Sequence, residues 1–204
     1  MKNKRYLSPK FIGEGFSVFL FRLHKILLYA LYTLLLSIPI VTAGGAHLAL
    51  FAQIRKLADD ENTDTHAYFA AFRSYGVAGI PYGVGLLLLV VGLSVPVVSG
   101  TLGFLLTAGC FLLYVLLLFY PAVRTAGYRG KDAVVRSVGY AASHAGETML
   151  LVGLAVIFLF AALYLSEILL LLFYPLTFFV TARIVIANNE EEEKEEENLY
   201  EKVT

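Results

Sequence analysis

The chain has 204 residues, of which 58% are hydrophobic and only 16% are charged. A soluble domain typically carries about a quarter charged residues, so this composition excludes an ordinary soluble protein. Apolar runs of about twenty residues recur along the chain, which is the length that crosses a hydrocarbon core about 30 Å thick. We therefore expect an all-α, multi-pass membrane protein.

The formal net charge of zero conceals an uneven distribution of charge along the chain. Residues 190–204 hold eight Glu and two Lys, whereas the 189 residues before them hold 14 Lys and Arg against eight acidic residues. The sequence therefore predicts one basic membrane domain over residues 1–187 and an acidic cytoplasmic tail over 188–204. We expect the tail to be solvated, and a partner-binding tail is the alternative.

The first apolar stretch is too long for one straight crossing, because it has no formally charged residue from 26 to 54. Within it, Pro39 removes a backbone donor, and the pair Gly44 and Gly45 is a natural helix end and turn. We therefore expect two short helices joined by a tight turn at these three residues.

Charge decides whether the chain turns back at this point. If the second helix stays on the far side of the membrane, six Lys and Arg lie on one side and ten on the other. If it returns to the starting side, all 16 lie together. Because basic residues in short loops stay in the cytoplasm, the sequence predicts that the chain turns back and that both termini are cytoplasmic.

Six crossings are expected in all, arranged as three hairpins that point away from the cytoplasm. Their approximate ranges are 20–42, 45–58, 77–98, 101–123, 148–166 and 168–187. The second crossing spans only about 21 Å at 1.5 Å per residue, so a re-entrant segment is the alternative to a full crossing.

Two amphipathic helices are expected on the cytoplasmic surface, over about 64–75 and 130–145. Each mixes aromatic or branched apolar residues with a basic side chain, as helices that lie in the plane of the headgroups do. Both contain the string Arg-Ser-x-Gly, at Arg73 and at Arg136, which is consistent either with a duplicated unit or with coincidence. We expect these two arginines to contact a partner protein or anionic lipid.

Two polar residues, His47 and Gln53, fall within the short second helix. Polar side chains inside a membrane are costly and are often functional, so these residues are a candidate intramembrane polar site. The alternative is that they form hydrogen bonds across the bundle and hold the short helix in place.

Small residues in the string GVAGIPYGVG indicate close packing between helices. Gly79 and Gly83 are four residues apart, a spacing that lets two membrane helices approach closely. Pro81, between them, predicts a kink. Cys110 is the one cysteine, which excludes an internal disulfide, and we expect it to be a small core residue.

The sequence offers no catalytic set and no metal-ligand cluster. Ser143 and His144 are adjacent, and neighbours on a helix point about 100° apart, which is unsuitable for a catalytic triad. Four dispersed His residues make a poor metal site, and no phosphate-binding or zinc-binding motif is present. We expect no enzyme activity, no metal, no cofactor and no nucleic-acid partner.

Two longer strings resemble the signature of a known family. SIPIVTAGGAHLALFAQIRKLADDEN followed by YFAAFRSYG is similar to the first half of the YesL-like bacterial integral membrane proteins (domain of unknown function 624), and FYPAVRTAGYRGKDAVVRSVGYAASHAGETMLL is similar to the second half. The absence of Trp and the Glu-rich tail depart from the family pattern. The resemblance implies a protein of the bacterial cell membrane without an assigned activity or catalytic residues.

Genes of that family often lie near sugar-uptake transporters of the ATP-binding cassette class. The resemblance therefore implies a non-enzymatic accessory or regulatory membrane protein linked to carbohydrate uptake. Its expected partners are the lipid bilayer, the subunits of a sugar transporter or a second copy of the chain. The alternative is a small autonomous transporter with a polar path near His47 and Gln53.

Overall fold

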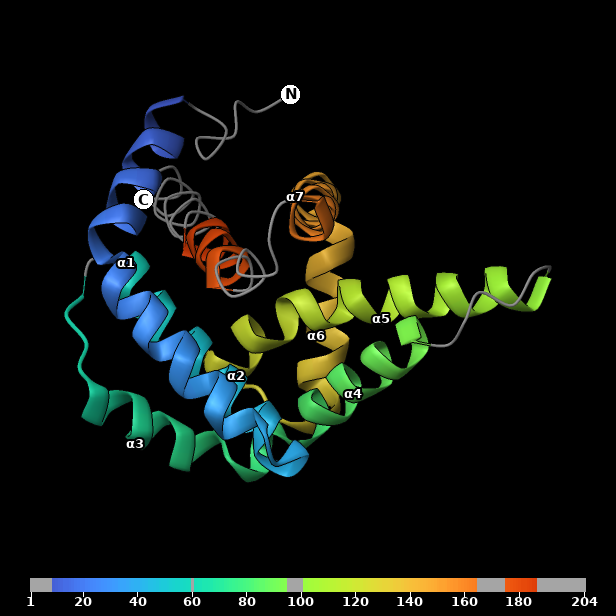
Figure 1. The fold of residues 1–204 in the computed structure, drawn as a ribbon, viewed down its shortest axis with the longest axis horizontal. Coiled ribbons are helices and arrows are strands. Elements are labelled where there is room, and N and C mark those ends of the chain that lie inside the picture. The colour runs from blue at the N-terminus through green and yellow to red at the C-terminus, as the bar shows by residue number, and fades with distance from the viewer. Residues whose placement is uncertain (1–8, 60, 95–100, 165–174, 187–204) are drawn as a thin grey trace, which may run out of the picture.

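A computed structural model of the chain describes residues 9–59, 61–94, 101–164 and 175–186 (Figure 1). Most of these residues are helical and none of them forms a strand, which confirms the all-α class. The elements are α1 (Pro9–Ser37), α2 (Ile40–Ala58), α3 (Thr65–Tyr75), the 3-10 turn η2 (Val77–Gly79), α4 (Ile80–Ser94), α5 (Thr101–Thr125), α6 (Gly130–Ser143), α7 (Ala145–Tyr164) and a last helix over Pro175–Ile186. The acidic tail and the far ends of several expected crossings lie outside the described residues.

Two segments of these helices are long and apolar enough to cross a membrane, Phe16–Ser37 in α1 and Ala108–Thr125 in α5. A third candidate is the pair formed by α3 and the segment Val77–Leu89, which is bent by 67°. Apolar helices over Ala145–Leu154 and Pro175–Ile186 are shorter. Within the residues described, the structure thus provides two or three possible crossings, and the six expected crossings are not confirmed.

The first two helices form an antiparallel hairpin, as predicted (Figure 1). At its closed end, α1 stops at Ser37, Pro39 takes an extended conformation before α2, and the Thr42 hydroxyl donates to the Pro39 carbonyl at 2.8 Å. At its open end, the Lys25 ammonium donates to the Asn62 side-chain oxygen at 2.7 Å. The chain therefore turns back on itself near Pro39.

The structure corrects the predicted position of this turn. Gly44 and Gly45 do not end a helix, because α2 begins at Ile40 and includes both residues. Pro39 is sufficient to break the helix, since its ring supplies no backbone N–H. The second helix is consequently 19 residues long, or about 28 Å, rather than the shorter helix over 45–58 that was predicted.

The glycine pair instead forms a backbone-to-backbone contact with the start of α4. A Cβ on Gly44 would lie 2.6 Å from the Gly83 nitrogen and closer still to the Gly79 carbonyl. A Cβ on Gly45 would lie 2.9 Å from the Gly76 Cα. Only a hydrogen atom fits in place of a side chain at Gly44 and Gly45. The predicted close packing at Gly79 and Gly83 is therefore present, and α2 is the helix that packs there.

The bend between α3 and α4 also differs from expectation. It occurs at Gly76 and η2, whereas Pro81 lies in the first turn of α4, where a missing N–H leaves no helical hydrogen bond unmade. The later glycines of α4 face α5, because a Cβ on Gly85 would lie 2.9 Å from the Leu117 side chain. One small-residue helix thus packs against two neighbours.

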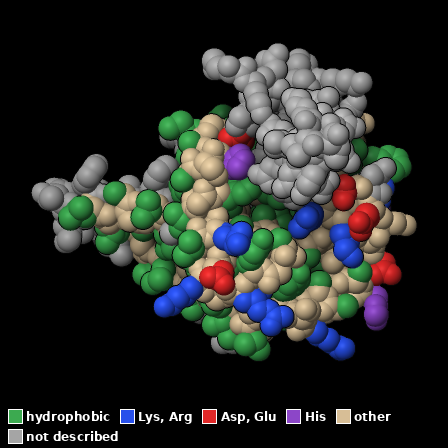
Figure 2. All heavy atoms as spheres, turned by 180° about the vertical axis from the view of Figure 1, so that it is seen from behind, with side chains coloured by type: hydrophobic (Ala, Val, Ile, Leu, Met, Phe, Trp, Pro, Cys, Tyr) green, Lys and Arg blue, Asp and Glu red, His purple; other side chains and the backbone are tan. Residues whose placement is uncertain are grey.

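Helix α2 is largely buried, and it contacts α1, α3, η2, α4 and α5. Seven of its residues have no exposed surface, namely Ala46, Leu48, Ala49, Leu50, Phe51, Ile54 and Leu57. Large apolar side chains are instead exposed along other helices, among them Leu34, Leu88, Leu112 and Met149. On the face drawn in Figure 2, the arm formed by the ends of α4 and α5 carries hydrophobic side chains, and the charged side chains gather on the body. Exposed apolar surface of this kind is typical of contact with lipid.

We predict that Gly79→Ala strongly destabilises the protein, because its new Cβ would lie 2.6 Å from the Gly45 Cα in a neighbouring backbone. The expected loss is at least about 2 kcal/mol, the cost of overpacking a tight contact. Thermal unfolding in detergent, followed by circular dichroism, measures it. Gly139→Ala in α6 is the matched control, since a Cβ there meets nothing within 4 Å. An equal melting temperature for both variants would contradict the backbone contact.

Candidate functional site

The two polar residues of α2 lie on different faces of the helix. His47 faces α4, where its ring centre lies 6.1 Å from that of Tyr82. Gln53, of which only 1% is exposed, faces α3 and donates from Nε2 to the Ala67 carbonyl at 3.3 Å. The structure therefore does not bring His47 and Gln53 together into one polar site.

On the Gln53 side, a network of hydroxyl groups joins α1 to α3 and to the loop before it. The Tyr29 hydroxyl lies 2.9 Å from the Thr63 hydroxyl, and the Thr33 hydroxyl lies 2.8 Å from that of Tyr68. Thr33 also donates to the Tyr29 carbonyl at 2.9 Å. Because these buried hydroxyl groups have partners, the cost of removing them from solvent is offset.

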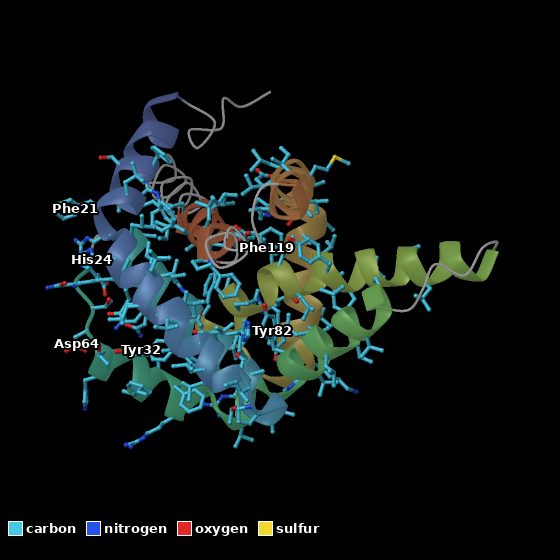
Figure 3. The ribbon with its side chains drawn as sticks, viewed as in Figure 1. Phe21, His24, Tyr32, Asp64, Tyr82 and Phe119 are labelled. Carbon is cyan, nitrogen blue, oxygen red and sulfur yellow. The ribbon has the colours of Figure 1, made fainter. Side chains whose placement is uncertain are left out.

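Aromatic packing reinforces this network. The rings of Tyr29 and Tyr68 are stacked, with centres 5.6 Å apart and an interplanar angle of 7°. Tyr32 contacts the rings of both Tyr68 and Phe69. Figure 3 shows Tyr32 and Asp64 on the side of the hairpin where α3 lies. Asp64 starts α3 by accepting a hydrogen bond from the Ala67 backbone at 2.7 Å.

The network is suited to holding helices together rather than to proton chemistry. The hydroxyl groups of Tyr29, Thr33 and Tyr68 are each paired with another hydroxyl group. Sequence reasoning missed these residues, because Tyr and Thr are scattered over two helices and a loop and form no local motif. Gln53 alone was identified, through its position in an apolar run.

On the His47 side, polar aromatic residues form a row through α2, α4 and α5. His47 donates from Nδ1 to the Ala43 carbonyl at 2.7 Å, since a carbonyl can only accept. The ring of Tyr82 stacks on that of Tyr120, with centres 5.7 Å apart and an interplanar angle of 12°. The Arg124 guanidinium adjoins the Tyr120 hydroxyl. The row therefore extends from His47 in α2, through Tyr82 in α4, to Arg124 in the last turn of α5.

The two arginines expected at the surface are both exposed. Arg73 lies in the last turn of α3, whereas Arg136 lies within α6 with its guanidinium 4.0 Å from the centre of the Tyr128 ring. The serines that follow them differ, because Ser74 is exposed and Ser137 is buried. The shared Arg-Ser-x-Gly string therefore has no equivalent orientation in the two helices.

Basic side chains also lie at the C-terminal end of α2, a role that the sequence pattern did not predict. Arg183 of the last helix donates from Nη1 to the Ala58 carbonyl at 3.1 Å, and Arg55 and Lys56 occupy the last turn of α2. Positive charge at this position complements the exposed carbonyls and the dipole of the helix. The contact joins two segments that are far apart in sequence, so no local pattern could have revealed it.

Residues suited to catalysis or metal binding are dispersed in the part of the chain that the structure describes. His, Cys, Asp and Glu side chains do not form a group of three or more there. The Ser143 hydroxyl lies 3.1 Å from Nδ1 of His144, but both groups also bind backbone carbonyls of their own helix. This pair is therefore part of the end of α6.

Comparison with models of protein families, with curated proteins and with solved structures yields no match for this chain. The functional argument consequently depends on the geometry of the chain and on the resemblance found in its sequence.

We predict a measurable coupling between Thr33 and Tyr68, whose hydroxyl groups lie 2.8 Å apart. In a double-mutant cycle of Thr33→Val and Tyr68→Phe, each single variant should lose about 1 kcal/mol, as for a typical buried hydrogen bond. The double variant should lose less than the sum, because the second change removes an already broken contact. Unfolding in detergent gives the free energies. Strict additivity would show that the two hydroxyl groups do not interact.

Proposed function

We propose that the chain is a multi-pass protein of the bacterial cell membrane with six crossings and with both termini in the cytoplasm. The distribution of charge supports this topology, since it places all 16 Lys and Arg on one side. The hairpin of α1 and α2 is consistent with it, because Lys25 and the residues after α2 meet at the same end. In this arrangement α2 is a crossing shielded by protein on most of its surface.

We further propose a non-enzymatic accessory or regulatory role in carbohydrate uptake, next to a transporter of the ATP-binding cassette class. The resemblance to the YesL-like family carries this proposal. The exposure of Arg73 supports it, because an exposed arginine can bind a partner protein. The short outer loops of the proposed topology leave little surface there for recognising a solute.

A small autonomous transporter is the second candidate, and one observation favours it. The row of His47, Tyr82 and Tyr120 is a set of polar groups at the meeting point of three helices, where such groups are usually functional. A polar path would follow this row and exclude Gln53, which faces α3.

The topology can be tested with single cysteines in a Cys110→Ala background. Ile38→Cys lies at the exposed tip of the first hairpin, and Glu61→Cys lies at its open end. A maleimide that cannot cross membranes should label position 38 in intact cells, and position 61 only after the cells are permeabilised. Labelling of both from outside would contradict the hairpin topology.

The accessory role predicts that crosslinking and mild detergent purification from native cells recover sugar-transporter subunits. Arg73→Gln should lower this recovery roughly fivefold, the equivalent of about 1 kcal/mol for a lost charged contact. Lys56→Gln, another exposed cation, is the matched control. Recovery of the chain alone would overturn the accessory role, and solute uptake by purified protein that is lost in His47→Leu would establish the transporter.

A further inference from the structure

Helix α6 has a packed face and an open face. The packed face consists of Ala133, Ser137 and Ala141, which are buried and spaced by one helical turn. Ala133 packs against apolar residues of α5, and Ala141 against α5 and α7. On the open face, the side chains of Val134, Val135 and Val138 are 44%, 66% and 43% exposed. Three branched apolar side chains on one open helix face are unusual in contact with water.

The same segment carries a strong excess of positive charge. From 124 to 136 the chain has four basic residues and one acidic residue, Asp132. Lys131 and Arg136 are exposed on α6 itself, and Arg129 is exposed directly before it. An open helix face that combines valines with these cations fits a surface that is apolar below and negatively charged above.

The turn before α6 holds part of this charge in place. Arg124 donates from Nη1 to the Tyr128 carbonyl at 2.8 Å, while the Arg136 guanidinium lies 4.0 Å from the centre of the Tyr128 ring. Gly127 and Gly130 have φ angles of 103° and 54°, a backbone conformation that favours glycine. Two guanidinium groups are thereby positioned around one exposed tyrosine.

Helix α3 has a different balance of positive and negative charge, although the sequence pattern predicts two surface helices of the same kind. From 55 to 73 the chain has three basic residues and four acidic residues, the acidic ones all between 59 and 64. Asp64 is the last of these acidic residues, and it directly precedes α3 as its N-cap. A negatively charged surface would repel this region and attract α6.

We infer that the open face of α6 docks on anionic phospholipid at the cytoplasmic surface of the membrane. Val134, Val135 and Val138 enter the boundary between headgroups and acyl chains, and Arg129, Lys131 and Arg136 bind the phosphate groups. α3 makes no such contact. The inference depends on the proposed membrane residence of the chain and adds the lipid class and the helix that recognises it.

The absence of Trp from the chain allows a direct test with single tryptophans in the full-length protein. Val135→Trp reports from α6, Phe69→Trp from the exposed side of α3, and Leu112→Trp from the candidate crossing in α5. Each protein is reconstituted in vesicles of phosphatidylcholine and phosphatidylglycerol at equal mole fractions. One lipid at a time carries bromine on its acyl chains, and quenching of the tryptophan fluorescence is measured.

At position 135, brominated phosphatidylglycerol should quench the reporter roughly fivefold more strongly than brominated phosphatidylcholine, the equivalent of about 1 kcal/mol in total. Arg129→Gln with Lys131→Gln and Arg136→Gln should remove this preference. At position 69 the two lipids should quench alike or not at all. Circular dichroism of each variant confirms that the helices are retained.

Three results would overturn the inference. Equal quenching of position 135 by both lipids would show that α6 does not select anionic lipid, and a preference retained in the triple variant would show that the cations do not cause it. Absence of quenching at 135 would leave α6 free for a protein partner. Quenching at 112 separates these outcomes from a failure of membrane residence, in which no reporter would be quenched.

Discussion

The structure depends on the backbone contact between α2 and the start of α4, at Gly44, Gly45 and Gly79. Because no side chain intervenes, the two helices approach more closely than ordinary packing allows. This contact holds α2 against η2 and α4, next to the bend of 67° between α3 and the segment Val77–Leu89. Side chains that flank the glycines are positioned as a consequence.

Two separate polar systems follow from the central place of α2. On one side, Tyr29, Thr33 and Tyr68 join α1 and α3 through hydroxyl groups and a stacked ring pair. On the other, His47 meets Tyr82 and, through it, Tyr120. In the first system each of these hydroxyl groups has a hydrogen-bond partner, as is typical of a contact that holds helices together. The second lies where three helices meet, and it is the position at which a solute path through the chain would be sought.

The balance of charge differs between α3 and α6. In α6, cations accompany an open apolar face, whereas α3 follows a run of acidic residues. We propose that the first recognises lipid and that the second, through Arg73, recognises protein. A membrane protein whose polar surface lies mainly on the cytoplasmic side can act on a transporter from that side without recognising the solute itself. This division gives the accessory role a physical basis in two separate contacts.

Local features of the sequence were sufficient for the helical class and for the approximate ranges of the surface helices. α3 and α6 begin and end close to the predicted residues because amphipathic spacing, the cap at Asp64 and glycine in the turn all act within a few residues. The return of the chain near Pro39 was also predictable, since proline supplies no backbone N–H and disfavours a continuous helix, although α5 continues through Pro121.

Only the tertiary structure decided what Gly44 and Gly45 do and how the polar residues are grouped. A glycine pair is compatible with a turn and with a close helix contact, and the choice depends on whether another backbone lies opposite. Likewise, His47 and Gln53 are six residues apart in sequence, but α2 directs them to different neighbours. The sequence by itself determined which segments are helical and apolar. The contacts between distant segments, such as Arg183 with the end of α2, arise only when the helices pack, because no local pattern encodes a partner.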